Sequence, residues 1–292
     1  MYEEYFEKLR IEGKLRNLRE STIYQYTARI TKFLRWKACD DPGEVTLEDI
    51  RNYIYEIRTN KKRSTQHCNT CRAALKFFYR FVLRKNWDED EVPYMRRDTK
   101  LPKVINLETV ELLIDTATEI RSKAIIALMY SSGLRLSELR YLAPDDIYMS
   151  TMQVHIRNSK NHRDHWTILS QRALELLIEY WKSNPVKRDF LFINPVHPDM
   201  PIKSSAVQTM FKKVGKDAGV PYIHPHILRH SFATHMIENK VPLEQIQAMM
   251  GHCCIDTTYK YIHVSNKVLM GIHSPLDHVS PVKKGECSDY EQ

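Results

Sequence analysis

The sequence lacks any segment that would direct the chain into or across a membrane. Its first ten residues, "MYEEYFEKLR", carry acidic side chains where a signal peptide begins with basic ones, and no apolar run follows them. No later stretch approaches the roughly 20 apolar residues that a membrane-spanning helix needs. We therefore expect a cytoplasmic protein without a membrane partner.

Cysteine is also scarce, with six residues in a chain of 292. So few cysteines exclude a disulfide scaffold, and a cytoplasmic protein keeps its thiols reduced. Cys68 and Cys71 form one CxxC pair, which is half of a zinc site, but no second pair at a suitable spacing follows. Burial of two small side chains in a helix is therefore the better interpretation.

Positive charge is in excess. Lysine and arginine total 44 against 36 aspartates and glutamates, which gives a formal net charge of +8. Such a balance implies an acidic partner. Charge alone leaves nucleic acid, an anionic membrane and an acidic protein as alternatives.

The length of the chain favours two domains. Residues 1–90 have a helical pattern with almost no glycine, whereas residues 91–103 combine prolines with clusters of both charges, as exposed linkers do. We expect a second domain over residues 104–276 and a flexible tail over residues 277–292.

Several helix boundaries can be predicted from local signals. Thr46, followed three residues later by Asp49, predicts a capping box at the start of a helix. Pro225 is well placed as the first residue of another helix, and a third should open at Pro242 and close at Gly251.

Residues 64–87 predict a helix with one apolar and one basic face. Leu75, Phe78 and Val82 share the inward side. The basic face has two interpretations, contact with DNA or an ordinary solvated surface. Its residues are Arg72, Lys76, Arg80 and Arg84.

The second domain contains one convincing β segment. Residues 152–169 predict two strands around a polar turn, while residues 106–117 and 122–142 precede them as helices and the remainder is again helical. The expected fold class is mainly α with a small antiparallel β-sheet.

The stretch "HPHILRHSFATHMIENK", residues 224–240, carries the first candidate site. At about 100° per residue, His226, Arg229, His230 and Ala233 fall on one face, and large apolar side chains fall on the other. A histidine and an arginine therefore project together from a helix that its apolar side anchors.

This face has competing interpretations. His226 and His230 have the spacing of zinc ligands, but the intervening glutamate of HExxH is missing and Arg229 would lie beside the metal. An imidazole next to a guanidinium suits an anionic oxyacid such as a phosphate ester. The third possibility is a core histidine and a surface arginine without a shared function.

A second arginine and a lysine extend the candidate set. Arg135 follows Gly133 near the start of a helix, with Glu138 one turn later able to hold it. This is an ordinary helix salt bridge unless Arg135 and Arg229 meet in space. Lys160, in the polar turn, is either solvated or delivers a positive charge to a bound substrate.

Two tyrosines follow in "MMGHCCIDTTYKYIH". His252 comes directly after the helix that Gly251 closes, and a further helix should carry Tyr259 and Tyr261. Side chains two residues apart on a helix point roughly 200° apart, so only one tyrosine can face a given site.

Taken in order, "SGLRLSELRYL", Lys160 in a turn, "HPHILRHSFATHM", "MMGH" and "TTYKYIHV" resemble the signature of the tyrosine recombinase or phage integrase family. The resemblance covers residues 100–276, and "RESTIYQYTARITKFLRW" is similar to the N-terminal core-binding domain of that family. His165 is a departure, because arginine is common at its position. The resemblance implies a helical core-binding domain followed by an α+β catalytic domain.

The resemblance also implies a set of catalytic residues. Tyr261 is the implied nucleophile and Tyr259 a bystander, His226 helps to remove the phenol proton, and Lys160 is a candidate acid for the departing 5′-oxygen. Two arginines and a second histidine stabilise the charge that builds on the phosphate. The set is Arg135, Lys160, His226, Arg229, His252 and Tyr261.

The activity that the resemblance implies is site-specific DNA recombination through a 3′-phosphotyrosyl link, without ATP, a metal or another cofactor. The implied partners are double-stranded DNA with specific recombination sites, a homotetramer on paired sites and an accessory directionality protein, all in the cytoplasmic nucleoid. Integration, excision and dimer resolution remain open. The alternatives are a type IB topoisomerase-like activity, a DNA-binding protein without catalysis, and a metal-dependent hydrolase built on His226 and His230.

Overall fold

The computed structural model describes residues 2–96, 102–157, 164–183 and 189–251. By its internal contacts the chain divides between Thr99 and Lys100 into two compact units. The exact limits expected for the linker (91–103), the catalytic domain (104–276) and the tail (277–292) stay predictions.

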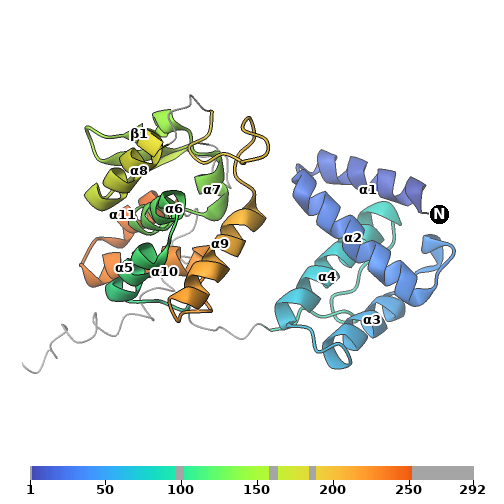
Figure 1. Cartoon of the computed structure of the whole chain (residues 1–292). Coiled ribbons are helices and arrows are strands. Elements are labelled where there is room, and N and C mark those ends of the chain that lie inside the picture. The colour runs from blue at the N-terminus through green and yellow to red at the C-terminus, as the bar shows by residue number, and fades with distance from the viewer. Residues whose placement is uncertain (1, 97–101, 158–163, 184–188, 252–292) are drawn as a thin grey trace, which may run out of the picture. The chain divides into compact units, whose positions relative to one another are not determined.

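The N-terminal unit is helical (Figure 1). Its helices enclose one apolar core, to which α2 contributes Ile30, Phe33 and Leu34 from one stripe. A 3₁₀ turn, Pro42–Glu44, precedes α3, and a π-helical segment, Phe78–Val82, continues α4. The α-helices among its described residues are α1 (Glu3–Leu15), α2 (Glu20–Lys37), α3 (Leu47–Thr59) and α4 (Thr65–Phe77).

The predicted capping box at the start of α3 is confirmed. The Thr46 hydroxyl accepts a hydrogen bond from the backbone N–H of Asp49 at 3.2 Å, and the Asp49 carboxylate accepts one from the backbone N–H of Thr46 at 2.8 Å. Each satisfied donor would otherwise lack a helical partner, so such a cap is worth about 1 kcal/mol.

The prediction of an exposed basic face on α4 is wrong at Arg72, because this residue is buried, with 6% exposed. Its Nε donates to the backbone carbonyl of Val92 at 2.6 Å, and its guanidinium pairs with Glu89, which also pairs with Lys76. The apolar face does point inward as expected, because Leu75, the residue of α4 in that set, is fully buried. Helical periodicity could not show that a later segment, residues 89–95, returns to cover the other side of α4.

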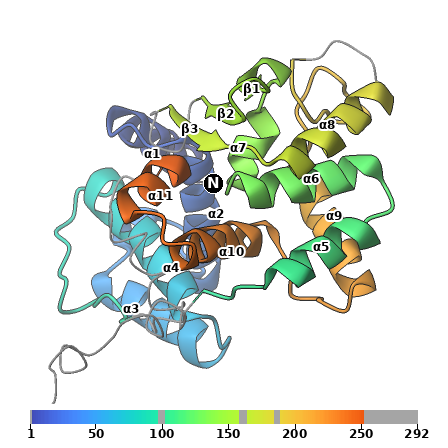
Figure 2. The same cartoon turned by 90° about the vertical axis from the view of Figure 1, so that its left-hand side faces the viewer.

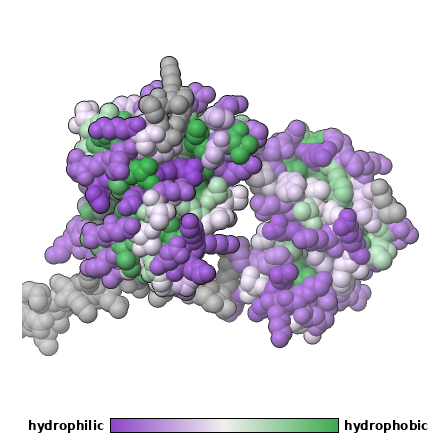
Figure 3. All heavy atoms as spheres, viewed as in Figure 1, coloured by the Kyte–Doolittle hydropathy of each residue, from purple (hydrophilic) through white to green (hydrophobic). Residues whose placement is uncertain are grey.

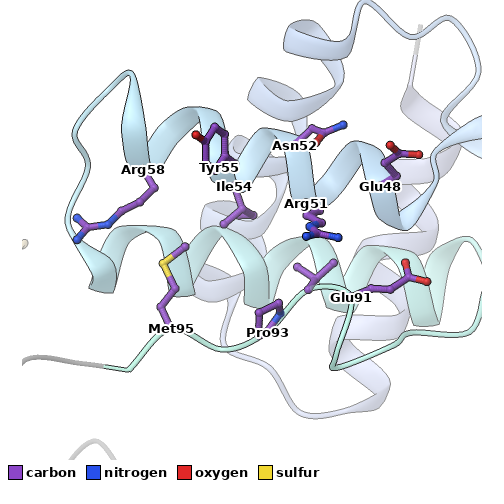
Figure 4. A pocket seen from close by; sticks show the side chains of 10 residues that line it. Glu48, Arg51, Asn52, Ile54, Tyr55, Arg58, Glu91, Pro93 and Met95 are labelled. Carbon is purple, nitrogen blue, oxygen red and sulfur yellow. The ribbon is translucent and has the colours of Figure 1, made fainter.

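The same returning segment creates a pocket of about 750 Å³ against α3 (Figure 4). Asn69 of α4 fixes the end of the segment, because its side-chain amide exchanges hydrogen bonds with the backbone of Met95 at 2.8 and 3.0 Å. The pocket is lined by Arg51, Tyr55 and Arg58 from α3 and contains none of the predicted catalytic residues.

The C-terminal unit is built around α6, whose residues 124–129 are buried on every side. Helices α5, α8 and α10 pack against α6 (Figure 2), which agrees with the apolar character of residues 124–129 on all sides of the helix. The helices are α5 (Leu107–Thr116), α6 (Ile120–Ser131), α7 (Leu136–Tyr141), α8 (Gln171–Ser183), α9 (Ser204–Asp217), α10 (Pro225–Glu238) and α11 (Leu243–Met250).

A three-stranded antiparallel sheet completes this unit, in the order β1 (Ile147–Tyr148), β2 (Gln153–Ile156) and β3 (His165–Ile168). The two predicted strands are β2 and β3; the two-residue strand β1 was not predicted, because it is too short to show an alternating pattern. The fold class, mainly α with a small antiparallel sheet, is confirmed.

The register of the sheet decides which side chains face the core. His165 lies opposite Ile156 and Thr167 opposite Val154, whose side chains are buried, so these four side chains share the inner face. Trp166, opposite His155, belongs to the outer face and is 44% exposed.

Hydrophilic residues cover most of the surface visible in Figure 3, with hydrophobic residues in separate small patches. Within the described ranges, no helix combines the length and the apolar character needed to span a membrane.

Candidate active site

Helix α10 begins at Pro225, as predicted, and packs against both α6 and α11 (Figure 2). Because α10 contacts both neighbours, polar as well as apolar side chains of this helix are buried. Arg229 is only 4% exposed, while His226, one turn earlier, is exposed to solvent. The two residues of the predicted face therefore differ in burial, with His226 at the surface and Arg229 in the interior.

The second arginine is positioned by a tight turn between α6 and α7. Gly133 has a φ of +61°, and a Cβ atom at this position would lie 2.4 Å from Cδ1 of Phe232 on α10. Glycine is therefore needed both for the left-handed backbone and for the close approach of α10. The turn delivers Arg135 to the N-cap position of α7.

Glu138 holds Arg135 as expected and also contacts the other arginine. Its carboxylate accepts hydrogen bonds from the backbone N–H of Arg135 at 2.8 Å and from Arg135 Nη1 at 2.5 Å. Its Oε2 atom lies 3.5 Å from Nη1 of Arg229. Arg135 and Arg229 thus meet in space, which turns an ordinary helix salt bridge into a three-residue cluster.

This arginine cluster, defined as Arg135, Glu138 and Arg229, keeps an excess of positive charge. The side chains of Glu138 and Arg229 are 3% and 5% exposed, and that of Arg135 is 18% exposed. Two guanidinium charges share one carboxylate, so one positive charge is left to attract an anion where water screens little.

Backbone carbonyls hold both guanidinium groups in place. Arg229 donates to the carbonyl of Gly133 at 2.7 Å and to that of Met250 at 2.6 Å. Arg135 donates to the carbonyl of Gly251 at 3.2 Å. Two of these acceptors lie at the end of α11, where the last carbonyls have no helical partner and the helix dipole favours a cation.

The end of α11 agrees with its prediction. The helix follows Pro242, and Gly251 closes it with φ 56° and ψ 44°, the left-handed geometry of a C-cap. His252 is the next residue in the chain, so the arginine cluster is tied to the backbone immediately before it.

The histidines at the start of α10 form a row of rings. The ring centroids of His224 and His226 are 6.2 Å apart, and those of His226 and His230 are 6.4 Å apart. Although His226 is exposed, partial loss of solvent around its imidazole is the largest cause that lowers its pKa, followed by His224 and Arg229. Burial, followed by His226 and Arg229, lowers the pKa of His230 to about 4. Both imidazoles are therefore neutral near pH 7 and able to accept a proton.

No third metal ligand joins His226 and His230 in the parts of the chain that the structure describes, where no group of three histidine, cysteine or acidic side chains could hold a metal ion. Arg229 also lies between the two histidines in sequence and carries a permanent positive charge. The residues described here do not fit a zinc site.

Three predicted residues lie outside the described residues. Lys160 belongs to residues 158–163, between β2 and β3, and His252 and Tyr261 follow α11. The structure therefore brings together Arg135 and Arg229 and places His226 one turn from Arg229 on the same helix. The part of the site that the sequence missed is the set of backbone carbonyls, for which no side-chain pattern exists.

Two family models match the chain. The phage integrase family matches residues 103–267, and the phage integrase N-terminal SAM-like domain matches residues 2–89. Together they cover most of both structural units.

Individual relatives agree with these matches. The chain is 31% identical over 274 residues to the tyrosine recombinase XerC of Pelobacter propionicus, covering 88% of this chain and 89% of the relative. It is 30% identical over 270 residues to the tyrosine recombinase XerA of Pyrococcus furiosus, covering 91% and 90%.

Similar solved structures include a crystal structure of XerA recombinase, with a TM-score of 0.54, 25% identity and coverage of 92% of this chain and 96% of the other. The fold is also shared with the XerH site-specific recombinase bound to a palindromic difH substrate, with a TM-score of 0.67, 22% identity and coverage of 89% and 81%. The structures share the fold, and the family models and the relatives show that the chain belongs to the phage integrase family and is a tyrosine recombinase.

Proposed function

We propose that the arginine cluster is the phosphate-binding centre at which this site-specific recombinase cleaves and rejoins double-stranded DNA. The observation that carries the proposal is the shared contact of Arg135 and Arg229 with buried Glu138. A guanidinium presents N–H donors in a planar fork that matches two phosphate oxygens. Because carbonyls and a carboxylate already fix both groups, they need not reorganise as charge develops on the phosphate.

In the proposed cleavage step, the phenol oxygen of Tyr261 forms a bond to phosphorus, and the bond from phosphorus to the 5′-oxygen breaks. His226 accepts the phenol proton, Lys160 donates a proton to the departing 5′-oxygen, and His252 adds a hydrogen bond to the phosphate. The product is a 3′-phosphotyrosine and a free 5′-hydroxyl. A second 5′-hydroxyl can reverse the step, because the phosphodiester energy is conserved in the protein link.

The lowered pKa of His226 supports its role in this step. An imidazole that is neutral at pH 7 can take a proton from a phenol, whose ordinary pKa is about 10. The guanidinium of Arg229, which contributes to the lowering, also favours the negatively charged phenolate over the neutral phenol.

Binding of specific DNA sites by a homotetramer belongs to the same proposal. XerH, whose fold this chain shares, is bound to a difH substrate in its structure, and λ integrase residues 75–356, with a TM-score of 0.68 and 16% identity, are a dimer on a core site. We infer a helical core-binding domain over residues 1–90, a linker over residues 91–103 and a catalytic domain over residues 104–276. We also infer that the protein acts in the cytoplasmic nucleoid and that an accessory protein sets the direction of recombination. Topoisomerase-like relaxation is not favoured, because the relatives are recombinases.

The test uses duplexes that the protein selects from a random library, each nicked so that cleavage traps the covalent complex. Wild type, Tyr261→Phe and the matched control Tyr259→Phe are incubated with this DNA in EDTA and separated on a denaturing gel. We expect a covalent band for wild type and Tyr259→Phe that Tyr261→Phe lacks. Loss of the band in Tyr259→Phe instead, or its absence from wild type that binds the DNA, would contradict the proposal.

A further inference from the structure

The imidazole of His165, the first residue of β3, lies directly against the backbone of Gly251. A Cβ atom at Gly251 would come 2.7 Å from Cε1, 2.8 Å from Nδ1 and 3.0 Å from Nε2 of this ring. These distances are shorter than real carbon contacts, so the ring fills the space beside the glycine. Strand β3 and helix α11 are direct neighbours along this contact.

The contact matters because of what the end of α11 holds. The carbonyls of Met250 and Gly251 accept hydrogen bonds from Arg229 and Arg135, at 2.6 and 3.2 Å. A shift of this short backbone segment therefore moves the acceptors of both guanidinium groups. His165 covers the segment from the side of the sheet.

A second side chain of β3 reaches the other support of the arginine cluster. Thr167 shares the inner face of the sheet with His165 and is 2% exposed. Its hydroxyl donates to the carbonyl of Ser132 at 2.9 Å. Ser132 directly precedes Gly133, whose carbonyl accepts the other hydrogen bond of Arg229.

From these contacts we infer that His165 is a positioning residue for DNA cleavage: together with Thr167 it braces both backbone segments that hold the arginine cluster. The inference rests on the proposed function of that cluster.

The first experiment compares His165→Ala with wild type in single-turnover cleavage at saturating DNA. A misplacement on the order of 1 Å in an active site can cost about a hundredfold in rate, so we expect cleavage to slow by about tenfold to a hundredfold. DNA affinity should change little, because His165 is placed to act through the backbone of Gly251. His155→Ala is the matched control, since His155 stacks on Trp166 on the outer face of the sheet, with ring centroids 4.4 Å apart. Equal cleavage rates for His165→Ala and wild type would overturn the inference.

A double substitution tests the contact itself. Gly251→Ala places a methyl group where the His165 ring lies and should slow cleavage severely. In Gly251→Ala combined with His165→Ala the ring is gone, so cleavage should recover part of the rate that Gly251→Ala loses. Strictly additive effects of the two substitutions would mean that the residues do not interact and would overturn the inference.

Hydrogen exchange in the DNA-free protein separates this inference from the proposed function. The backbone N–H of Gly251 donates to the carbonyl of Ala248 at 3.1 Å, and we expect this amide to exchange at least several-fold faster in His165→Ala but not in His155→Ala. If exchange rises while wild type forms no covalent complex, the proposed function fails and the bracing contact stands. If exchange is unchanged, His165 does not hold the end of α11 and the inference fails whatever the DNA assay shows.

Discussion

Replacing Glu138 with glutamine removes the one negative charge that the arginine cluster contains. The substitution keeps the size and shape of the side chain, so it leaves no cavity. It also leaves the guanidinium groups of Arg135 and Arg229 without the carboxylate that contacts both, at 2.5 and 3.5 Å. The perturbation is therefore mainly electrostatic.

The expected magnitude follows from burial. The side chain of Glu138 is 3% exposed, so water cannot replace the lost charge. Removing one partner of a buried ion pair costs about 3–5 kcal/mol, because the remaining charge is left uncompensated. Glutamine still offers a carbonyl oxygen to the backbone N–H of Arg135, which retains about 1 kcal/mol of that sum. We expect the free energy of unfolding of the C-terminal unit to fall by about 2–4 kcal/mol, a large part of an ordinary domain stability of roughly 5–15 kcal/mol.

The assay must report on the C-terminal unit alone, because a chain of two units need not unfold in one step. Urea titration followed by hydrogen exchange of peptides from α6 and α10 meets this requirement. Glu111→Gln, an exposed substitution on α5, is the control and should change the free energy of unfolding by less than about 0.5 kcal/mol. If Glu138→Gln is as stable as this control, the carboxylate does not hold the two arginines and the reasoning is refuted.

Three further predictions concern other parts of the chain. Gly133→Ala should destabilise the C-terminal unit by about 2–5 kcal/mol. About 1–2 kcal/mol of this comes from an alanine in the left-handed conformation and about 1–3 kcal/mol from overpacking against Phe232. An unchanged urea midpoint would contradict this prediction. Burial and positive neighbours lower the pKa of His230 to about 4, so the contribution of its neutral imidazole to the free energy of unfolding is complete above pH 6.5 and is lost as the pH falls towards 4. In urea titrations at several pH values, His230→Gln should lose less stability over this range than wild type. An unaltered pH profile in the variant would contradict the prediction. Arg72→Met removes the hydrogen bond to the Val92 carbonyl and should lower the free energy of unfolding of the N-terminal unit by about 1.5–3 kcal/mol. The loss should be measurable as faster hydrogen exchange in residues 89–95. Amides that stay protected there would argue against the prediction.

Much of the local structure could be predicted from the sequence. The capping box at Thr46, the start of α10 at Pro225 and the end of α11 at Gly251 all agree with local signals. Each depends on hydrogen bonds or backbone angles within about one helical turn, so the residues that decide it are neighbours in sequence. The two longer strands were also predicted from a local pattern, two segments on either side of a polar turn, whereas β1, with two residues, is too short to show a pattern.

The sequence by itself determined the residue types of the site: two arginines, the histidines and a glutamate one turn after Arg135. Only the tertiary structure decided that Arg135 and Arg229 share Glu138, that backbone carbonyls hold both guanidinium groups, and that Arg72 is buried under a returning segment. These contacts join segments far apart in sequence, and no local period records where a distant carbonyl will lie. Side-chain spacing fixes the face on which a residue projects, but the packing of the whole unit fixes what that face meets.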